Sequence, residues 1–391
     1  MLHKTKLFEA RVGGYHNYRV PGLLTTPRGV VLATVEARRG RGGDWDGNDV
    51  LMRRSLDGGR SWGRPQTIVR CDDYGPGPVS NFAMIADQSD DRVHALYCHN
   101  YARVFYQHSA DDGATFSDPV EITDVFLAFR DASLGRAAYP WRVIATGPGH
   151  GIQLSQGQHE GRLIVPVWMS DGSGTEFGPG KLGHRPSSVA CIYSDDVATG
   201  GRAVTWQCGD FVAHTDDPSH AGARIVNPSE TVPVELSDGR VLFNIRSEAR
   251  ENRRLVSISA DGAHRWSRPR FDRALLEPVC MASILRLEQR APDGTPYILF
   301  ANPDNLENEL IPAGGHLAHD RKRLTVKLSA DDCRTWSASR VLEPGPSGYS
   351  DLAQAPDGSV LCIYECGMID RMTDTANVTV ASFGLRWVTG S

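Results

Sequence analysis

The hydrophobic positions of this chain fall into short segments rather than into long helical periods. Four of these segments carry apolar and β-branched residues in short runs: Val50–Arg53, Val104–Gln107, Leu255–Ile258 and Leu324–Lys327. Short runs bounded by turn residues are typical of strands, whereas an amphipathic helix needs apolar residues three and four apart over about 12 residues. No capped helical period competes with these segments, so the pattern predicts an all-β fold.

Each of the four segments leads into the same turn, Ser-x-Asp-x-Gly-x-Thr-Trp. Two clear copies are Ser55–Trp62 and Ser109–Phe116; two looser copies are Ser259–Trp266 and Ser329–Trp336; a fifth, decayed copy runs from Ser194 and Asp196 toward Trp206. Asp and Gly tolerate the left-handed backbone of a tight hairpin turn and satisfy its amide groups, while the aromatic residue packs beneath it. The repeat therefore predicts recurring β-hairpins.

The spacing of the turns predicts the architecture. They begin at positions 55, 109, 194, 259 and 329, and their mean step of 68.5 residues divides the 391 residues into about six units. Repeats of this kind favour a six-bladed β-propeller of four-stranded antiparallel blades over a β-sandwich. Because each blade needs its neighbours to bury its faces, residues 1–391 are expected to form a single domain.

Composition and charge narrow the class of protein. Glycine accounts for 40 of 391 residues, against roughly 7% in ordinary chains, which agrees with a fold rich in turns. The formal net charge of −5 argues against a nucleic-acid partner. No run of about 18 apolar residues predicts a membrane span, and the first residues lack a signal peptide. We therefore expect a cytoplasmic protein, with a secreted or periplasmic one left open if a signal was removed.

Three further segments carry a family resemblance. Tyr18–Pro21, Thr146–Leu154 and Gly348–Leu352, the last followed by Ile363–Glu365, are combined here with the repeated turns. Together they resemble the sialidase (neuraminidase) family of the bacterial type, whose members are six-bladed propellers with such "Asp-box" turns. The resemblance covers almost the whole chain. It implies a glycoside hydrolase, a retaining exo-α-sialidase that removes terminal α-linked sialic acid from glycoconjugates and needs neither a metal nor an organic cofactor.

Sialic acid carries a carboxylate on its anomeric carbon, and arginine binds a planar carboxylate bidentately. The resemblance assigns this role to three separated residues: Arg19, Arg246 and Arg321. Arg323, two positions beyond the last of them, is a rival for its place. The resemblance also implies that Arg38 contacts a sugar hydroxyl and that Glu365 holds Arg19.

The same resemblance implies the catalytic residues. Tyr349 is the expected nucleophile, because a carboxylate would be repelled by the carboxylate of the sugar, and sialidases use tyrosine. A phenol with a pKa of about 10 needs a base, which by resemblance is Glu230, although Ser229 precedes it where many relatives have Asn. Asp44, in a glycine-rich loop, is the expected acid and base toward the leaving oxygen, with Asp46 and Asp49 as competitors.

Three alternatives stay open at this point. The substrate could be a deaminated or otherwise modified nonulosonic acid, read by a pocket for which Asn81, Phe82 and Met84 are candidate lining residues. The enzyme could transfer the sugar to an acceptor, as a trans-sialidase does. A sialic-acid-binding propeller without catalysis is also conceivable, but it would be free to lose the catalytic residues, which are all present. The sequence predicts no oligomeric state.

Overall fold

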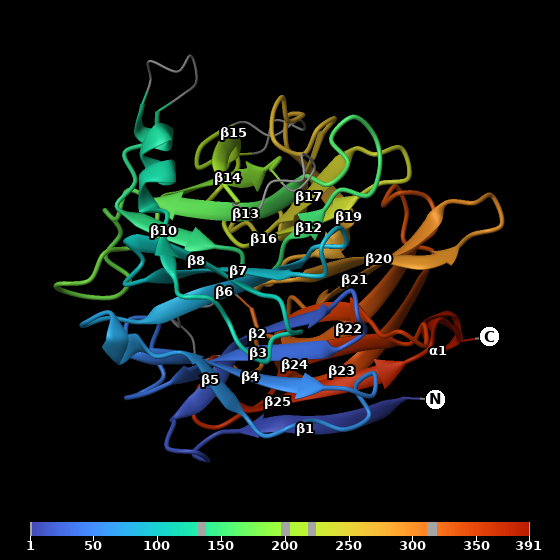
Figure 1. The fold of residues 1–391 in the computed structure, drawn as a ribbon, viewed down its shortest axis with the longest axis horizontal. Helices are drawn as coiled ribbons and strands as arrows, with labels where there is room; N and C mark the ends of the chain where they lie inside the picture. The colour runs from blue at the N-terminus through green and yellow to red at the C-terminus, as the bar shows by residue number, and fades with distance from the viewer. Residues whose placement is uncertain (1, 132–137, 197–203, 218–223, 311–318, 391) are drawn as a thin grey trace.

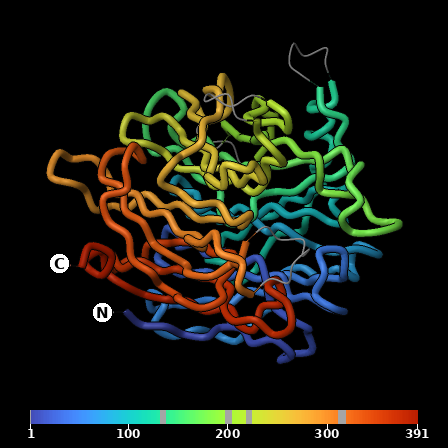
Figure 2. Tube along the Cα trace, turned by 180° about the vertical axis from the view of Figure 1, so that it is seen from behind, coloured from blue at the N-terminus to red at the C-terminus, as the bar shows by residue number. Residues whose placement is uncertain are grey.

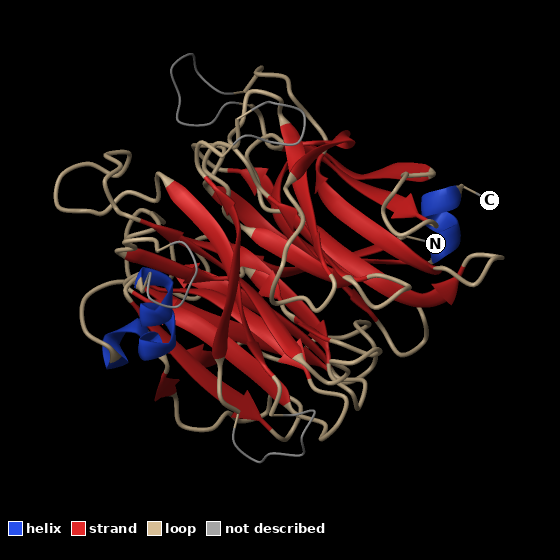
Figure 3. Cartoon of the chain, turned by 90° about the horizontal axis from the view of Figure 1, so that it is seen from above, coloured by secondary structure: helices blue, strands red, loops and turns tan. Residues whose placement is uncertain are grey.

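The computed structural model describes residues 2–131, 138–196, 204–217, 224–310 and 319–390. Strands make up nearly all of its regular structure, so the predicted all-β class is confirmed. The helical segments are short: η1 (Cys71–Asp73), η2 (Thr123–Arg130) and α1 (Leu385–Thr389). η2 and α1 lie at the edges of the molecule (Figure 3). In the part of the chain that is described, no helix is long and apolar enough to cross a membrane.

Five sheets form a propeller-like arrangement (Figure 1). The first sheet has the order β2 (Asn17–Thr25), β3 (Val31–Arg38), β4 (Asn48–Ser55), β5 (Gln66–Val69). The second has the order β11 (Gly149–His150), β6 (Val79–Ala86), β7 (Val93–His99), β8 (Arg103–Ser109), β9 (Val120–Glu121). All described strand pairs are antiparallel except β11 with β6.

The remaining three sheets follow the same up-and-down course. The third is β10 (Val143–Thr146), β13 (Leu163–Ser170), β14 (Ser187–Ser194), β15 (Gln207–His214), with β12 (Ile152–Gln153) also on β13. The fourth is β16 (Thr231–Glu235), β17 (Val241–Ile245), β18 (Arg253–Ser259), β19 (Arg270–Leu276). The fifth has seven strands: β1 (His3–Glu9), β25 (Thr375–Phe383), β24 (Val360–Met368), β23 (Ala338–Gln354), β22 (Lys322–Ser329), β21 (Pro296–Pro303), β20 (Ser283–Arg290).

The seven-stranded sheet is the point at which the architecture differs from the prediction. Four sheets have four or five strands, as separate blades would, but six separate blades are not observed. The physical reason is the 17-residue strand β23, which pairs with β22 through residues 338–346 and with β24 through residues 347–354. One continuous backbone thus joins two sets of strands that the repeat spacing counts as two units.

The two ends of the chain meet in this same sheet. β1 is hydrogen-bonded to β25 in an antiparallel register, with His3 opposite Ser382 and Glu9 opposite Asn377. Both Figure 1 and Figure 2 show the N-terminal strand beside the C-terminal part of the chain. The first strand of the chain therefore completes the last sheet, which ties the two ends of the sequence together.

The repeated turns have the hydrogen bonds that their sequence predicts. In the first copy the Ser55 hydroxyl donates to Asp57 (2.7 Å) and accepts from the amide of Gly59 (2.8 Å). The Asp57 carboxylate also accepts from the amide and hydroxyl of Ser61 (2.9 and 2.5 Å). Ser109, Ser259 and Ser329 repeat the Ser–Asp contact at 2.8, 2.9 and 2.9 Å. Each turn joins the third and fourth strands of its unit, remote from the site described below.

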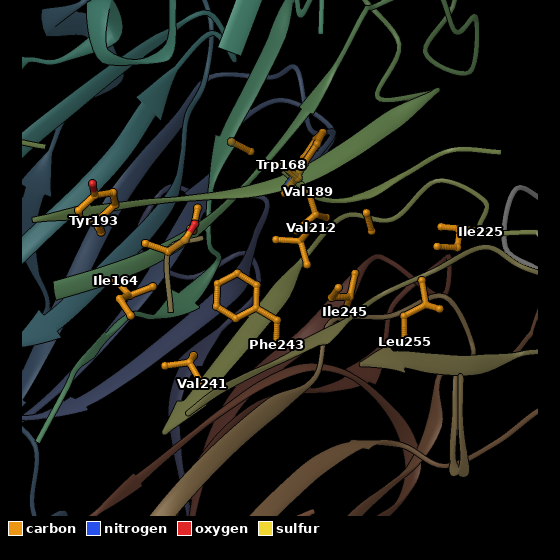
Figure 4. Close-up of a cluster of buried hydrophobic side chains, with 14 of the residues drawn as sticks. Ile164, Trp168, Val189, Tyr193, Val212, Ile225, Val241, Phe243, Ile245 and Leu255 are labelled. Atoms are coloured by element: carbon orange, nitrogen blue, oxygen red, sulfur yellow. The ribbon is translucent and has the colours of Figure 1, made fainter. Parts of the chain in front are cut away.

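The hydrophobic core lies between neighbouring sheets. One buried cluster joins the third and fourth sheets, with Ile164 and Val189 on one side and Phe243 and Leu255 on the other (Figure 4). The Phe243 ring also packs on Trp266, the aromatic residue of an Asp-box turn, at a centroid distance of 4.1 Å. Burial of such side chains is the main favourable term that holds blade against blade.

Phe243→Ala tests this packing. The side chain is fully buried between two sheets, so its removal leaves a cavity and is expected to lower the free energy of unfolding by about 3–5 kcal/mol. Chemical denaturation followed by tryptophan fluorescence measures the change. Leu56→Ala is the matched control, because Leu56 is 75% exposed and its truncation should change stability by about 0.5 kcal/mol or less. Equal effects of the two substitutions would contradict the packing argument.

Candidate active site

A cavity of about 700 Å³ brings together residues that lie far apart in the sequence. Its lining includes seven of the eight residues expected at the site: Arg19, Arg38, Asp44, Glu230, Arg246, Arg321 and Tyr349. Several of them stand at strand ends, since Glu230 precedes β16, Arg246 follows β17 and Arg321 precedes β22. Propeller-like packing of the sheets is what places these ends around one cavity.

At the buried end of the cavity, Tyr349, Glu230 and Arg246 contact one another. The Tyr349 hydroxyl donates a hydrogen bond to one carboxylate oxygen of Glu230. Arg246 Nη1 donates to the other oxygen of Glu230 and to the Tyr349 hydroxyl oxygen, the latter at 2.8 Å. Tyr349 and Glu230 are only 7% and 8% exposed. A phenol, a carboxylate able to take its proton and a fixed cation therefore form one hydrogen-bonded unit.

The protonation state of Tyr349 follows from its surroundings. Burial of the phenol and the nearby Glu230 carboxylate raise the pKa of Tyr349 well above its usual value of 10, although Arg246, Arg321 and Arg19 act in the opposite direction. The tyrosine is accordingly neutral at physiological pH and acts as the hydrogen-bond donor to Glu230. Its deprotonation requires transfer of the proton to a partner already in contact.

Two further arginines approach the Tyr349 ring. The guanidinium carbons of Arg19 and Arg321 lie 5.1 and 5.3 Å from the ring centroid, and both side chains are about 95% buried. Arg321 donates to the carbonyl of Val279 (2.7 Å) and makes no ion pair with any described carboxylate. A buried cation without a counter-charge is costly, so this end of the cavity favours an anionic ligand.

Burial and the cavity lining distinguish Arg321 from Arg323. Arg321 is buried and lines the cavity, whereas Arg323, two residues on, is exposed and does not line it. The backbone of Arg323 has a positive φ of 62°, and the register between β22 and β23 shifts across it, between Lys322 and Leu324. Only the first arginine of the pair is therefore placed to meet a ligand.

Glu365 lies behind the cavity wall rather than in it. Its carboxylate accepts from Arg19 Nε (3.0 Å) and Nη2 (3.3 Å), which is the contact expected from the sequence. It also accepts from the backbone amides of Val20 (3.0 Å) and Tyr349 (3.1 Å). Gly348 leaves room for this carboxylate, since a Cβ there would lie 2.2 Å from a Glu365 oxygen. One buried side chain thus fixes Arg19 and the Tyr349 backbone together.

Asp44 lines the cavity from the loop after β3. Arg38 Nη1 donates to its carboxylate (2.7 Å), and Arg38 is itself held by Glu36 (2.6 Å). The Asp44 side chain is 34% exposed. Burial alone would raise the pKa of Asp44, but Arg38 and then Arg19 outweigh it and hold the pKa well below its usual value. In the unliganded protein Asp44 is ionised.

The two competitors of Asp44 have structural partners instead. Asp46 accepts from the backbone amides of Arg41 (3.0 Å) and Gly43 (2.9 Å) and so shapes the loop. Asp49 is fully buried outside the cavity, where it accepts from the Tyr15 hydroxyl (2.6 Å) and the Cys71 amide (2.9 Å). Of the three carboxylates, only Asp44 lines the cavity.

Asn227, three residues before Glu230, has its hydrogen-bond partner elsewhere. Asn227 Nδ2 donates to Glu248 (2.8 Å), and among the described contacts it makes none with Glu230. The Glu230 backbone carbonyl instead accepts from the amide of Arg246 (3.0 Å). Backbone pairing between the approach to β16 and the end of β17 therefore sets Glu230 beside Arg246 without the asparagine.

One wall of the cavity was not predicted from the sequence. Tyr101, Trp168, Phe177 and His184 line it, and the His184 ring lies 4.6, 5.1 and 4.5 Å from the rings of Tyr101, Trp168 and Phe177. Burial lowers the pKa of His184 to about 4, so the imidazole is neutral at physiological pH. These residues belong to different loops and strands and share no motif, so no signal in the chain could have grouped them.

Of Asn81, Phe82 and Met84, which were candidates to line the substrate pocket, only Asn81 lines the cavity. Asn81 lines the cavity and donates its backbone amide to Glu36 (2.9 Å). Phe82 and Met84 do not line it, and their assignment is wrong. Both side chains pack in the buried cluster between the first and second sheets, because alternate residues of β6 face that core.

Comparisons with known proteins agree with this geometry. The model of the BNR repeat-like domain family matches residues 29–362. A sialidase of Micromonospora viridifaciens is 31% identical over 392 residues, which cover 96% of this chain. The chain spans 53% of the length of that relative.

Solved structures give the same fold. A Hadza microbial sialidase superposes with a TM-score of 0.75 at 23% identity, covering 98% of this chain and 69% of that one. The intramolecular trans-sialidase from Ruminococcus gnavus superposes with a TM-score of 0.71 at 16% identity, covering 98% of both chains. With the family model spanning most of the sequence, the chain belongs to the BNR repeat-like domain family and, within it, to the sialidases.

Proposed function

We propose that this protein is a retaining exo-α-sialidase that hydrolyses terminal α-linked sialic acid from sialylated glycans. The observation that carries the proposal is the contact of Tyr349 with Glu230 inside a cavity that is also lined by Arg19, Arg246 and Arg321. A glycosidase with two ordinary carboxylates would have no use for a phenol paired to a base. The named sialidases among the relatives support the same reading.

The carboxylate of the sugar binds to Arg19, Arg246 and Arg321. Arg19 is oriented by Glu365 and Arg246 by Glu230, whereas Arg321 has no described counter-ion. An incoming carboxylate therefore gains charge-assisted hydrogen bonds and compensates a buried cation at the same time. Because the three guanidinium groups surround the Tyr349 ring, this anchoring places the adjacent anomeric carbon beside the phenol oxygen.

The reaction then proceeds in two steps. Tyr349 Oη forms a bond to the anomeric carbon, its proton passes to Glu230, and the glycosidic bond breaks as the leaving oxygen takes a proton from Asp44. In the second step water attacks the same carbon and gives a proton to Asp44, while Glu230 returns its proton to the released Tyr349. Two inversions retain the α configuration, and no metal or organic cofactor takes part.

Asp44 needs a proton to act as an acid, although it is ionised in the free protein. Arg38 and Arg19 hold its pKa low. A bound substrate supplies a carboxylate that offsets the charge of Arg19 and covers the exposed third of the Asp44 side chain. Both effects raise the pKa of Asp44, so substrate binding itself prepares the acid.

We also propose that the seven-stranded sheet represents two blades that share strand β23. The two halves of this strand pair with different neighbours, and the second half carries Tyr349. The ring then has six units, four of which have a described Asp-box turn between their third and fourth strands, and the sixth is completed by β1. The decayed copy between Ser194 and Trp206 lies partly outside the described residues.

Transfer to an acceptor is the second candidate function. One structural neighbour is an intramolecular trans-sialidase, whose fold this chain shares over 98% of its length. A tyrosyl intermediate that reacts with a sugar hydroxyl in place of water uses the same residues. Hydrolysis and transfer therefore differ in the acceptor alone, and both have to be measured.

The first product distinguishes these reactions. Aryl α-glycosides of N-acetylneuraminic acid and of its deaminated analogue are incubated with the protein and followed by NMR. We expect the α anomer of the free acid to appear first. Release of the β anomer first would contradict the retaining mechanism, and turnover of neither glycoside would overturn the sialidase proposal. Added lactose reveals transfer as a sialylated product, and a 2,7-anhydro product reveals intramolecular transfer.

Tyr349→Phe removes the nucleophile while keeping the ring that the arginines surround. We expect kcat to fall by about 10³-fold or more, because neither water nor Glu230 replaces a positioned phenol. Binding of a carboxylate-bearing sialic acid analogue, measured by calorimetry, should persist. Tyr193→Phe, on β14 outside the cavity, is the matched control and should keep full activity. An active Tyr349→Phe protein would show that another group is the nucleophile.

Asp44→Asn tests the acid through the leaving group. Sialyllactose, which leaves as an alcohol, should lose activity on the order of 10³-fold, because the departing oxygen needs a proton. An aryl sialoside leaves as a stabilised phenolate, and its kcat/KM should fall far less. Asp46→Asn provides the comparison, since Asp46 contacts only the loop backbone. Equal losses with both leaving groups would assign Asp44 a structural role.

A further inference from the structure

The exposed end of the cavity is formed by a segment that the proposed chemistry does not use. We call residues 367–374, from the last residues of β24 to the start of β25, the rim hairpin. It lines the cavity with Met368, Asp370, Arg371, Met372 and Thr373. Met368 is 36% exposed, and Asp370 and Arg371 are exposed as well, in contrast to the buried Tyr349 end. The cavity thus extends from a buried, cationic end to an open end of mixed chemistry.

The rim hairpin lies beside the loop that carries Asp44. Arg371 Nη2 donates to the backbone carbonyl of Arg41 in that loop (3.3 Å). At the base of the hairpin, the buried carboxylate of Asp374 hydrogen-bonds to His16 (2.9 Å) and Asn17 (2.9 Å). The hairpin is therefore fixed at its base and in contact with the acid loop at its tip.

The same two residues also support the acid loop. Gly42 has a positive φ of 74°, and a Cβ there would lie 2.8 to 2.9 Å from the side chains of Asn17 and His16. The loop that carries Asp44 and the base of the rim hairpin therefore both contact His16 and Asn17. The leaving oxygen must lie next to the Asp44 carboxylate, so the group attached to that oxygen extends toward the rim hairpin.

We infer that the rim hairpin binds the neutral sugar to which the sialic acid is attached. This inference rests on the proposed function, because it assumes that Asp44 faces the leaving oxygen. Met368 and Met372 offer adaptable apolar contacts to the apolar face of a sugar ring. Asp370 accepts and Arg371 donates hydrogen bonds, which suits the hydroxyls of a hexose. A free aryl leaving group lacks those hydroxyls and can use only the apolar contacts.

The charges of the hairpin fit an uncharged partner. Asp370 pairs with Arg11 at 3.6 Å, and both side chains are largely exposed, so this pair is weak and can yield to a hydroxyl. Arg371 contributes one positive and Asp370 one negative charge to the open end. A second anionic sugar would meet the carboxylate of Asp370, whereas a neutral hexose satisfies both groups.

The experiment compares two substrates in two variants. Asp370→Ala and Arg371→Ala are assayed with α-sialyllactose and with an aryl α-sialoside, and the ratio of the two kcat/KM values is followed. Loss of one hydrogen bond to a charged group should lower the ratio of sialyllactose to aryl turnover by about tenfold in at least one variant. Arg323→Ala, an exposed arginine outside the cavity, should leave the ratio unchanged.

The possible outcomes separate this inference from the proposed function. If the unmodified protein turns over neither substrate, the proposed function fails. If it turns over both but the ratio stays within twofold in both variants, the rim hairpin does not bind the leaving sugar. Equal losses on both substrates also overturn the inference, because the aryl substrate lacks the leaving sugar. A fall of the ratio in Arg371→Ala alone, with the KM of sialyllactose unchanged, overturns it too, because displacement of the acid loop through Arg41 impairs only the substrate that needs the acid. Thermal unfolding of each variant confirms that the ratio is measured on folded protein.

Discussion

The buried carboxylate of Glu365 is the contact on which the rest of the site depends. It holds the Arg19 guanidinium on one side and the backbone amides of Val20 and Tyr349 on the other. Strands β2 and β23 belong to different sheets, so this side chain joins two blades at the point where their functional residues meet. Without it, Arg19 would be a buried cation lacking a counter-charge, which costs several kcal/mol.

The cavity contains buried charged side chains, whose removal from water opposes folding unless they are paired. Arg246 pairs with Glu230, Arg19 pairs with Glu365, and Arg38 pairs with both Glu36 and Asp44, while Arg321 has no described carboxylate as a partner. Such groups are maintained because the surrounding sheets are tightly packed and cannot relax around them. The incomplete balance at Arg321 favours an anionic ligand at this end of the cavity.

The loop with Asp44 shows how stability and chemistry are separated. Asp46 shapes the loop through its backbone amides, and Gly42 allows a close approach to Asn17. Asp44 is left to face the cavity with Arg38 as its only direct partner among the described side chains. The loop therefore combines two structural positions, Gly42 and Asp46, with one cavity-lining carboxylate within five residues.

The sequence by itself determined the features that depend on near neighbours. Strand segments and Asp-box turns are formed by residues within about eight positions of each other, so their hydrogen bonds follow from local backbone preferences. The family resemblance carried by Tyr18–Pro21 and Gly348–Leu352 also named most of the expected residues that line the cavity, because it ties each of them to a position along the chain. The class of fold followed for the same reason.

Only the tertiary structure decided the choices that depend on distant contacts. It placed Asp44 and Arg321 at the cavity and left Asp49 and Arg323 outside it. It also placed Phe82 in the hydrophobic core instead of the cavity. It also assembled the aromatic wall around His184 and joined two sets of strands through β23. The physical reason is the same in each case: strand register and sheet packing set which face a residue presents, and both depend on chain segments far apart in the sequence.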